Sequence, residues 1–409
     1  MDKPSLEVAD IFRAYGQEYR EKHGHTLSLQ QLRVMRDIEI CRTALLGGHI
    51  RACDDENCDH VEISYNSCRN RHCPKCQSLA KANWLHARQA EILPVDYYHL
   101  IFTIPDDLLG PVALQNKEVC YNLLFHSAAQ TLLTTAADPE HLGAQIGFLA
   151  LLHTWGQSLT HHPHLHCLAP GGGLSPDGQK WISCPPNYFL DVEVLSRRFQ
   201  QCLLDALRNA YQRGMLEFHG SIKDLAQQDS FDQLLDSCQE PAWVVYAKPP
   251  FAGPEKGLDY LARYTHRVAI SNHRLLSMED GEVTFTCKDY KDSGLQKTIT
   301  LPAEEFIRRF LLHVLPNGFS RVRYYGLFAN RCRANNLQHC RSLLDKAQAT
   351  ISTTVARMDW PELVLFLTGK DPLKCPKCSR GHLVIVEALK PVPRTQVVDA
   401  GPHPGIDSS

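Results

Sequence analysis

The hexapeptide His161–His166 holds four histidines in six residues. Residues two apart on an extended strand face the same side, so we expect His164 and His166 to converge on one ion. Two imidazoles and a third polar ligand leave positions at which a divalent ion can bind and polarise a phosphate oxygen. His153 is the first choice for the third ligand and Gln157 the second. Strand histidines are also often exposed or satisfied by hydrogen bonds, which is the structural alternative.

Two phenols, Tyr260 and Tyr264, are spaced to lie one turn apart on a predicted helix, with Arg267 just after it. A phenol, with a reference pKa of about 10, is a weak nucleophile until a metal or cation stabilises the phenolate or activates the phosphodiester it attacks. Tyrosines at this spacing are ordinarily packing residues. The histidine pattern in the same chain favours the nucleophilic interpretation.

Two cysteine pairs, Cys53-x4-Cys58 and Cys73-Pro-Lys-Cys76, have the spacing of a tetrahedral structural zinc site. We predict that these four thiolates hold one Zn²⁺. Free buried cysteines are the alternative, but such short spacings seldom recur by chance.

The segment between these pairs adds further ligands and two cations. Cys68, His60 and His72 leave open an exchanged fourth ligand or a second metal ion. Arg69 and Arg71 extend from the loop and are predicted to contact nucleic acid. A contact between proteins is the alternative role for such a module.

A third cysteine pair, Cys375-Pro-Lys-Cys378, has no second pair beside it in the sequence. Cys332 and Cys340 are distant candidate partners, and a turn with two free thiols fits equally well. We therefore assign no role to the pair.

A basic segment runs from Phe306 to Leu344 without a single Asp or Glu. Tyrosines and a phenylalanine are interleaved, so phosphate contacts and base stacking on single-stranded DNA are predicted, against the alternative of a solvated cationic face. The arginines are Arg308, Arg309, Arg321, Arg323, Arg331, Arg333 and Arg341.

Strand-like and helical stretches alternate without a regular βαβ pattern, which predicts an α+β fold with an antiparallel sheet flanked by helices. Ile146–Trp155 and Pro163–Leu168 are expected to form an antiparallel hairpin. The expected domains are a helical lead-in (1–48), a zinc-binding domain (49–92), a catalytic domain (95–290) with an insertion (176–240), a basic DNA-binding region (291–370), and a C-x-x-C pair with a flexible tail (371–409).

Composition sets the protein class. The chain has 409 residues, 44% of them hydrophobic, and a net charge of −2, so any DNA contact must come from local patches. It shows neither a signal-peptide pattern nor a long apolar run, and its 16 cysteines occur in patterns that suit metal thiolates. We expect a soluble cytoplasmic protein.

Several motifs resemble, in order and spacing from Arg51 to Arg333, the transposases of IS91-type insertion sequences. These are two-tyrosine rolling-circle transposases of the histidine-hydrophobe-histidine (HUH) class. The motifs are the run from Ser64 to Cys76, His153-Thr-Trp-Gly-Gln, His162-Pro-His-Leu-His, Gly171-Gly-Gly, and the run from Tyr260 to Ser271.

The resemblance implies an HUH-endonuclease-like sheet in which His164 and His166 are metal ligands and Tyr260 and Tyr264 are nucleophiles. Mg²⁺ or Mn²⁺ would polarise the scissile phosphate of single-stranded DNA at the element ends and target. One tyrosine would then form a 5′-phosphotyrosine and release a 3′-hydroxyl. This bond retains the energy of the broken one, so no nucleotide cofactor is expected, and the chain has no G-x-x-x-x-G-K-[ST] motif.

Two other functions compete with transposition. A replication initiator or relaxase would use the same chemistry for another task. A zinc-dependent DNA-binding regulator would bind without cleaving, with its histidines and tyrosines in structural roles.

Overall fold

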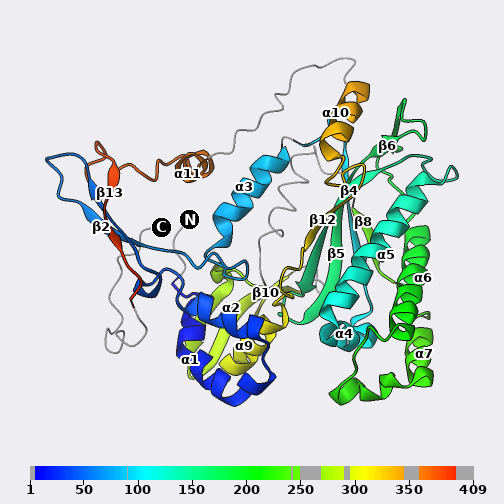
Figure 1. Cartoon of the computed structure of the whole chain (residues 1–409), viewed down its shortest axis with the longest axis horizontal. Coiled ribbons are helices and arrows are strands. Elements are labelled where there is room, and N and C mark those ends of the chain that lie inside the picture. The colour runs from blue at the N-terminus through cyan, green and yellow to red at the C-terminus, as the bar shows by residue number, and fades with distance from the viewer. Residues whose placement is uncertain are drawn as a thin grey trace. The chain divides into compact units, whose positions relative to one another are not determined.

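The computed structural model describes residues 5–89, 91–240, 243–248, 269–289, 295–344 and 359–392. The chain divides into two compact units (Figure 1). Unit 1 comprises residues 1–84, 266–314 and 356–409, and unit 2 comprises residues 85–265 and 315–355. The combination of helices with antiparallel sheets confirms the predicted α+β class.

Unit 2 is built on a five-stranded sheet with the order β12-β4-β5-β3-β8, in which every neighbouring pair is antiparallel. The predicted hairpin is present as β4 and β5. The strands are β3 (Tyr97–Thr103), β4 (Gly147–Trp155), β5 (His161–Pro170), β8 (Val245–Lys248) and β12 (Val322–Gly326). A small second sheet pairs β6 (Gly172–Leu174) with β7 (Trp181–Ser183).

Helices pack on one face of the large sheet (Figure 1). They are α4 (Asp106–Gln115), α5 (Lys117–Ala137) and α6 (Val192–Gln212), with α7 (Gln228–Ser237) beyond them. Because side chains alternate along a strand, Leu165, Cys167 and Ala169 of β5 enter the core beneath these helices. His164 and His166 point to the opposite face, which we call the histidine face.

The segment expected as an insertion, 176–240, instead completes this core. Helix α6 packs along α5, and Phe199 lies edge-on to Phe102 of β3 with ring centroids 5.0 Å apart. Both rings are fully buried. The sequence of α6 contains no motif from which its packing beside the sheet could be predicted.

Unit 1 contains two three-stranded antiparallel sheets, with the orders β11-β10-β9 and β13-β1-β2. Phe12 of α1 and Phe310 of α9 meet edge to face at 5.3 Å in its core. The elements are α1 (Val8–His23), α2 (Leu29–Glu39), β1 (Gly48–Cys53), β2 (Val61–Tyr65), β9 (Leu275–Glu279), β10 (Glu282–Asp289), β11 (Leu295–Pro302), α9 (Ala303–Leu312), α11 (Trp360–Thr368) and β13 (Leu383–Leu389). Helix α3 (Gln77–Gln89) spans the boundary between the units, and α10 (Arg333–Leu344) belongs to unit 2.

Two expected boundaries differ from the observed units. The range 291–370 is divided between the units after Val314, because α9 packs on α1 whereas β12 pairs with β4. Part of 371–409 is a strand rather than a tail: β13 pairs with β1 from Gly48↔Leu389 to Cys53↔Leu383. These contacts join segments that lie far apart in the sequence, so the sequence pattern did not predict them. Within the described residues, no helix has the length and apolarity needed to cross a membrane.

The role of α6 in the core can be tested by mutation. We expect Phe199→Ala to lower the free energy of unfolding by about 3–5 kcal/mol, because it leaves a cavity under the sheet. Arg197→Ala, at an exposed position of the same helix, should change it by less than about 0.5 kcal/mol. Denaturant unfolding of the full chain measures both values. A small loss for Phe199→Ala would mean that this helix is peripheral.

Candidate functional site

Three imidazoles meet on the histidine face of the large sheet. His153 of β4 stands directly opposite His164 of β5, and His166 follows two residues along the same strand. One ring nitrogen of each lies within 4.8 Å of those of the other two. A β-bulge interrupts the β4–β5 register just beyond His153. Bulges commonly redirect side chains beside functional sites.

The hydrogen bonds of His164 and His166 leave their Nε2 atoms facing each other at 3.2 Å. Nδ1 of His164 lies 2.7 Å from the carbonyl oxygen of His162, which only accepts, so this nitrogen carries the proton and Nε2 carries the lone pair. Nδ1 of His166 lies 2.7 Å from Nε2 of the buried His99 on β3. Such outer contacts fix the orientation of metal-binding histidines.

This donor set fits a divalent ion. Metal–nitrogen bonds of about 2.1 Å at right angles separate two nitrogens by about 3.0 Å, close to the distance between His164 and His166. Burial, with a smaller contribution from the charge of His162, lowers the pKa of His164 to about 3. The ring is therefore neutral at pH 7, as a metal ligand must be. Gln157, the alternative third ligand, lies in the connection between β4 and β5.

Two further contacts anchor the start of β5. His162 forms an ion pair with Asp106, which opens α4, and Nε2 of His161 lies 2.8 Å from the hydroxyl of the buried Tyr121. The His161 ring has its pKa lowered to about 3 by burial and by Lys117. The sequence motif thus divides into two ligand candidates and two anchoring residues. Sequence reasoning missed His99 and Asp106, because neither belongs to a motif.

The predicted nucleophiles Tyr260 and Tyr264, and the adjacent Arg267, lie outside the described residues. One phenol on the histidine face escaped notice in the sequence. Tyr246 of β8 is about half exposed and stands opposite Ile101 of β3, which in turn stands opposite His166.

The cysteines form two clusters, and neither is the predicted quartet of Cys53, Cys58, Cys73 and Cys76. The first cysteine cluster consists of Cys41, Cys68, Cys73 and Cys76; the second consists of Cys53, Cys58, Cys375 and Cys378. Each combines one predicted pair with cysteines that lie elsewhere. The spacing identified the two pairs correctly. Because the pairs are neighbours in the sequence, we expected them to share one ion, but they belong to different clusters.

The first cysteine cluster joins the end of α2 to the turn before α3. The Sγ atom of Cys76 lies 3.4 Å from that of Cys41 and 3.5 Å from that of Cys68. Backbone amides donate to the sulfurs of Cys41 and Cys68 at 3.5 Å. Contacts with the neighbouring thiols lower the pKa of Cys41 and Cys76. This arrangement of sulfurs suits tetrahedral zinc.

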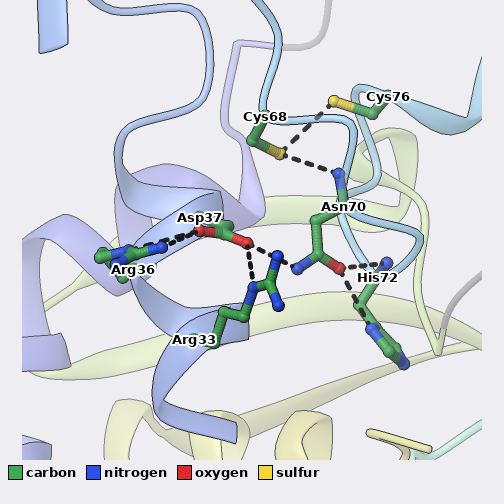
Figure 2. A network of polar contacts seen from close by, with 7 residues as sticks. All are labelled: Arg33, Arg36, Asp37, Cys68, Asn70, His72 and Cys76. Carbon is green, nitrogen blue, oxygen red and sulfur yellow. Dashed lines mark hydrogen bonds and ion pairs between the residues drawn. The ribbon is translucent and has the colours of Figure 1, made fainter. Parts of the chain in front are cut away.

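Figure 2 shows how Asn70 connects this cluster to α2. Its side-chain nitrogen donates to Asp37 at 2.9 Å, its side-chain oxygen accepts from the amide of His72 at 2.9 Å, and its own amide donates to the sulfur of Cys68. Asp37 is also paired with Arg36 at 3.0 Å. Asn70 is therefore the polar link between the helix and the cysteine loop.

Of the alternative ligands, the structure brings Cys68 into the first cysteine cluster but not His60 or His72. His60 lies 3.5 Å from Glu62, and the ring of His72 contacts Asn70. Cys41 was missed because it matches the apolar spacing of the preceding helix. The helix ends at Glu39, which leaves Cys41 in the turn beyond it.

The second cysteine cluster joins β1 to the turn before β13. Sγ distances are 3.6 Å between Cys53 and Cys378 and 3.8 Å between Cys58 and Cys375. Amides of Gly381 and Arg380 lower the pKa of Cys378 to about 6. The suggested partners Cys332 and Cys340 belong to unit 2. Cys340 is part of α10 and is buried in a small apolar core.

The arginines predicted to bind DNA occupy different environments. Arg308 and Arg309 of α9 both pair with Glu305, one residue outside the acid-free segment. Arg323 faces the helices, where its guanidinium lies 4.2 Å from the ring centre of Phe125 and donates to Asn122 at 2.5 Å. Each of these three side chains already has a partner within the protein, so the absence of acids in the sequence overstated their availability.

The other predicted arginines also differ in their surroundings, and one of them, Arg333, lies near the histidine face. Arg333 is 4.4 Å from the ring centre of Tyr324, which stands opposite Leu149 on that face, and pairs with Glu91 at 3.4 Å. Arg331, directly before α10, is exposed. Arg321 is half-buried, and Nη2 of Arg341 lies 3.2 Å from the carbonyl oxygen of Ile92. Arg69 is exposed and has a φ of 53°. Burial lowers the pKa of Arg71.

Two known protein families match successive segments of the chain. Residues 11–104 match the family described as "Transposase zinc-binding domain", and residues 147–336 match the family "Putative transposase". The second match contains the three histidines, and the first contains the whole first cysteine cluster. The protein is therefore a transposase, a class of enzymes that cleave DNA and transfer its strands.

Two relatives define the family more closely. The chain is 52% identical to "Putative transposase y4qJ" of Sinorhizobium fredii over 95% of its own length and 96% of the relative. It is 28% identical to the transposase for insertion sequence element IS801 of Pseudomonas savastanoi pv. phaseolicola, over 84% and 83% of the two lengths. The chain belongs to the IS91 family of insertion-sequence transposases. No solved structure matches it.

The linking role of Asn70 yields a testable expectation. Asn70→Ala should lower the free energy of unfolding by about 1–2 kcal/mol and speed the loss of zinc to a chelator, because Asp37 loses one of its hydrogen-bond donors and the His72 amide loses its acceptor. Asn209→Ala, at an exposed position of α6, is the control and should change neither quantity. An unchanged rate of zinc release in Asn70→Ala would show that the link does not support the metal site.

Proposed function

We propose that this transposase nicks single-stranded DNA at the ends of its element and rejoins it through 5′-phosphotyrosine intermediates. The observation that carries the proposal is the convergence of His153, His164 and His166 on the histidine face of an antiparallel sheet. This is the arrangement expected of an HUH endonuclease, in which two strand histidines separated by one apolar residue share an ion.

His153, His164 and His166 would hold Mg²⁺ or Mn²⁺. When bound, such an ion polarises the non-bridging oxygens of the scissile phosphate. His99 and the carbonyl of His162 act as positioning groups, since they hold the two β5 rings with Nε2 toward the ion. A separate zinc ion at the first cysteine cluster would have a structural role.

Tyr260 and Tyr264 would be the nucleophiles. The phenolic oxygen of one forms a bond to phosphorus, the bond from phosphorus to the 3′ oxygen breaks, and the 3′ oxygen leaves as a hydroxyl after taking up a proton. The new phosphodiester on tyrosine retains the energy of the broken one, so a 3′-hydroxyl of another strand can reverse the step without a nucleotide cofactor. Two phenols allow two strands to be held at once.

Covalent capture of DNA tests the nucleophiles. With single-stranded element ends and Mg²⁺, Tyr260→Phe and Tyr264→Phe singly should retain some nicking but block complete transposition, whereas the double variant should form no adduct stable to denaturation. Tyr188→Phe, at an exposed phenol before α6, is the control and should form the adduct normally. An adduct in the double Phe variant would refute the assignment and direct attention to Tyr246.

The metal ligands can be separated from DNA binding in the same assay. His164→Ala with His166→Ala should abolish the adduct yet leave affinity for single-stranded DNA within about threefold, because phosphate contacts come from other residues. Adduct formation by this variant would exclude these histidines from catalysis.

The differing environments of the arginines give a paired test of the DNA surface. Arg331→Ala should weaken binding to unrelated sequences alike and reduce the slope of log K against log salt by about 0.7, the value for one lost phosphate contact. Arg323→Ala should leave that slope unchanged but destabilise the fold by about 1–2 kcal/mol, because its guanidinium loses the Phe125 ring and the Asn122 side chain as partners. A reversed pattern would place the DNA on the helix-covered face.

A further inference from the structure

We propose a second structural zinc site formed by Cys53 and Cys58 near one end of the chain and Cys375 and Cys378 near the other. The matched zinc-binding family ends at residue 104 and so contains only half of these ligands. The two halves of the site are separated by more than 300 positions in the sequence, as the Cys53–Cys378 separation of 325 illustrates.

The sulfur positions fit one tetrahedral ion. All four Sγ atoms lie within 4.8 Å of one another, and the measured contacts of 3.6 and 3.8 Å match the edge of about 3.8 Å expected for zinc–sulfur bonds of 2.3 Å. All four cysteines are free thiols, at distances too long for disulfides.

The backbone around the sulfurs is arranged as two facing turns. The amide of Asp55 donates to the sulfur of Cys53 at 3.5 Å, and the amide of Gly381 donates to that of Cys378 at 3.4 Å. The turns are also joined directly, since the amide of Asp54 donates to the carbonyl of His382 at 3.0 Å. Amides directed at sulfur favour the thiolate form, which is the form that binds metal.

Steric and charge features agree with the site. A Cβ atom on Gly381 would lie 2.6 Å from the sulfur of Cys53, so only glycine allows this approach of the two turns. Lys377 and Arg380 of one turn form ion pairs with Asp59 and Asp55 of the other, so the two turns are also joined by charge.

Among the described residues, the sheet that bears the site buries little apolar surface. Three strands seldom form a stable unit unless an apolar face is covered. In β13, Val384, Ile385 and Val386 are 44%, 63% and 58% exposed, and Val61 of β2 is 58% exposed. A metal ion that joins β1 to the turn before β13 therefore substitutes for a missing core.

Zinc counting on the full-length protein tests the proposal. Protein purified with Zn²⁺ and freed of loosely bound metal should contain about two zinc ions per chain by elemental analysis. Cys375→Ser/Cys378→Ser and Cys53→Ser/Cys58→Ser should each contain about one, and their combination should still contain one, because both pairs serve the same ion. Combining Cys53→Ser/Cys58→Ser with Cys73→Ser/Cys76→Ser should remove both ions.

The control Cys202→Ser/Cys332→Ser, which removes two thiols outside the clusters, should keep two ions. A single ion in the wild type, two ions in Cys375→Ser/Cys378→Ser, or none in the combined Cys53/Cys58/Cys375/Cys378 variant would overturn the proposal. Failure of the DNA adduct assay would leave these counts unaffected, so the two proposals are tested separately.

Alkylation of the wild type avoids any folding defect of the variants. In zinc-loaded protein, Cys375 and Cys378 should resist iodoacetamide at least tenfold more than after treatment with a chelator, as measured by mass spectrometry. Cys202 should react equally in both states. Equal reactivity of Cys375 and Cys378 with and without the chelator would show that no metal is bound there.

Discussion

The antiparallel pairing of β4 with β5 is the constraint on which the candidate catalytic site depends. Pairing sets His153 opposite His164, and the two-residue repeat of a strand returns His166 to the same face. The same repeat sends Leu165 and Cys167 into the core beneath the helices. A shift of one residue in this register would bury the imidazoles and expose the apolar side chains, so the core and the site determine each other.

One sheet of unit 1 relies on a different kind of interaction, although the helices of this unit have an apolar core of their own. Its sheet β13-β1-β2 exposes much of its apolar surface, and cysteines gather at both ends of β1: the first cluster lies near its start through Cys41, and the second contains Cys53 at its end. Metal–thiolate bonds are local and directional, so they hold short loops that could not bury enough surface to fold alone. Unit 2, by contrast, has a large continuous core.

Sequence reasoning succeeded where a pattern is local. The strand repeat predicted that His164 and His166 share a face, and the apolar runs predicted the β4–β5 hairpin. The predicted cysteine quartet was wrong. Cys53 and Cys58 instead lie beside Cys375 and Cys378, which are more than 300 residues away in the sequence. Cys41 was hidden for a related reason: its position also satisfies a helical apolar repeat. Long-range pairings of this kind leave no trace in spacing.

The arginine-rich segment shows why composition alone misjudges a binding surface. An acid-free run of residues can still be neutralised by acids that lie just outside it, as Glu305 does for Arg308 and Arg309, or that pack against it from another element, as Glu91 does for Arg333. Aromatic rings engage a further guanidinium, that of Arg323. The charge available to DNA is thus smaller than the sequence suggests. For a protein with a net charge of −2, binding then depends on where the few uncommitted cations lie relative to the histidines.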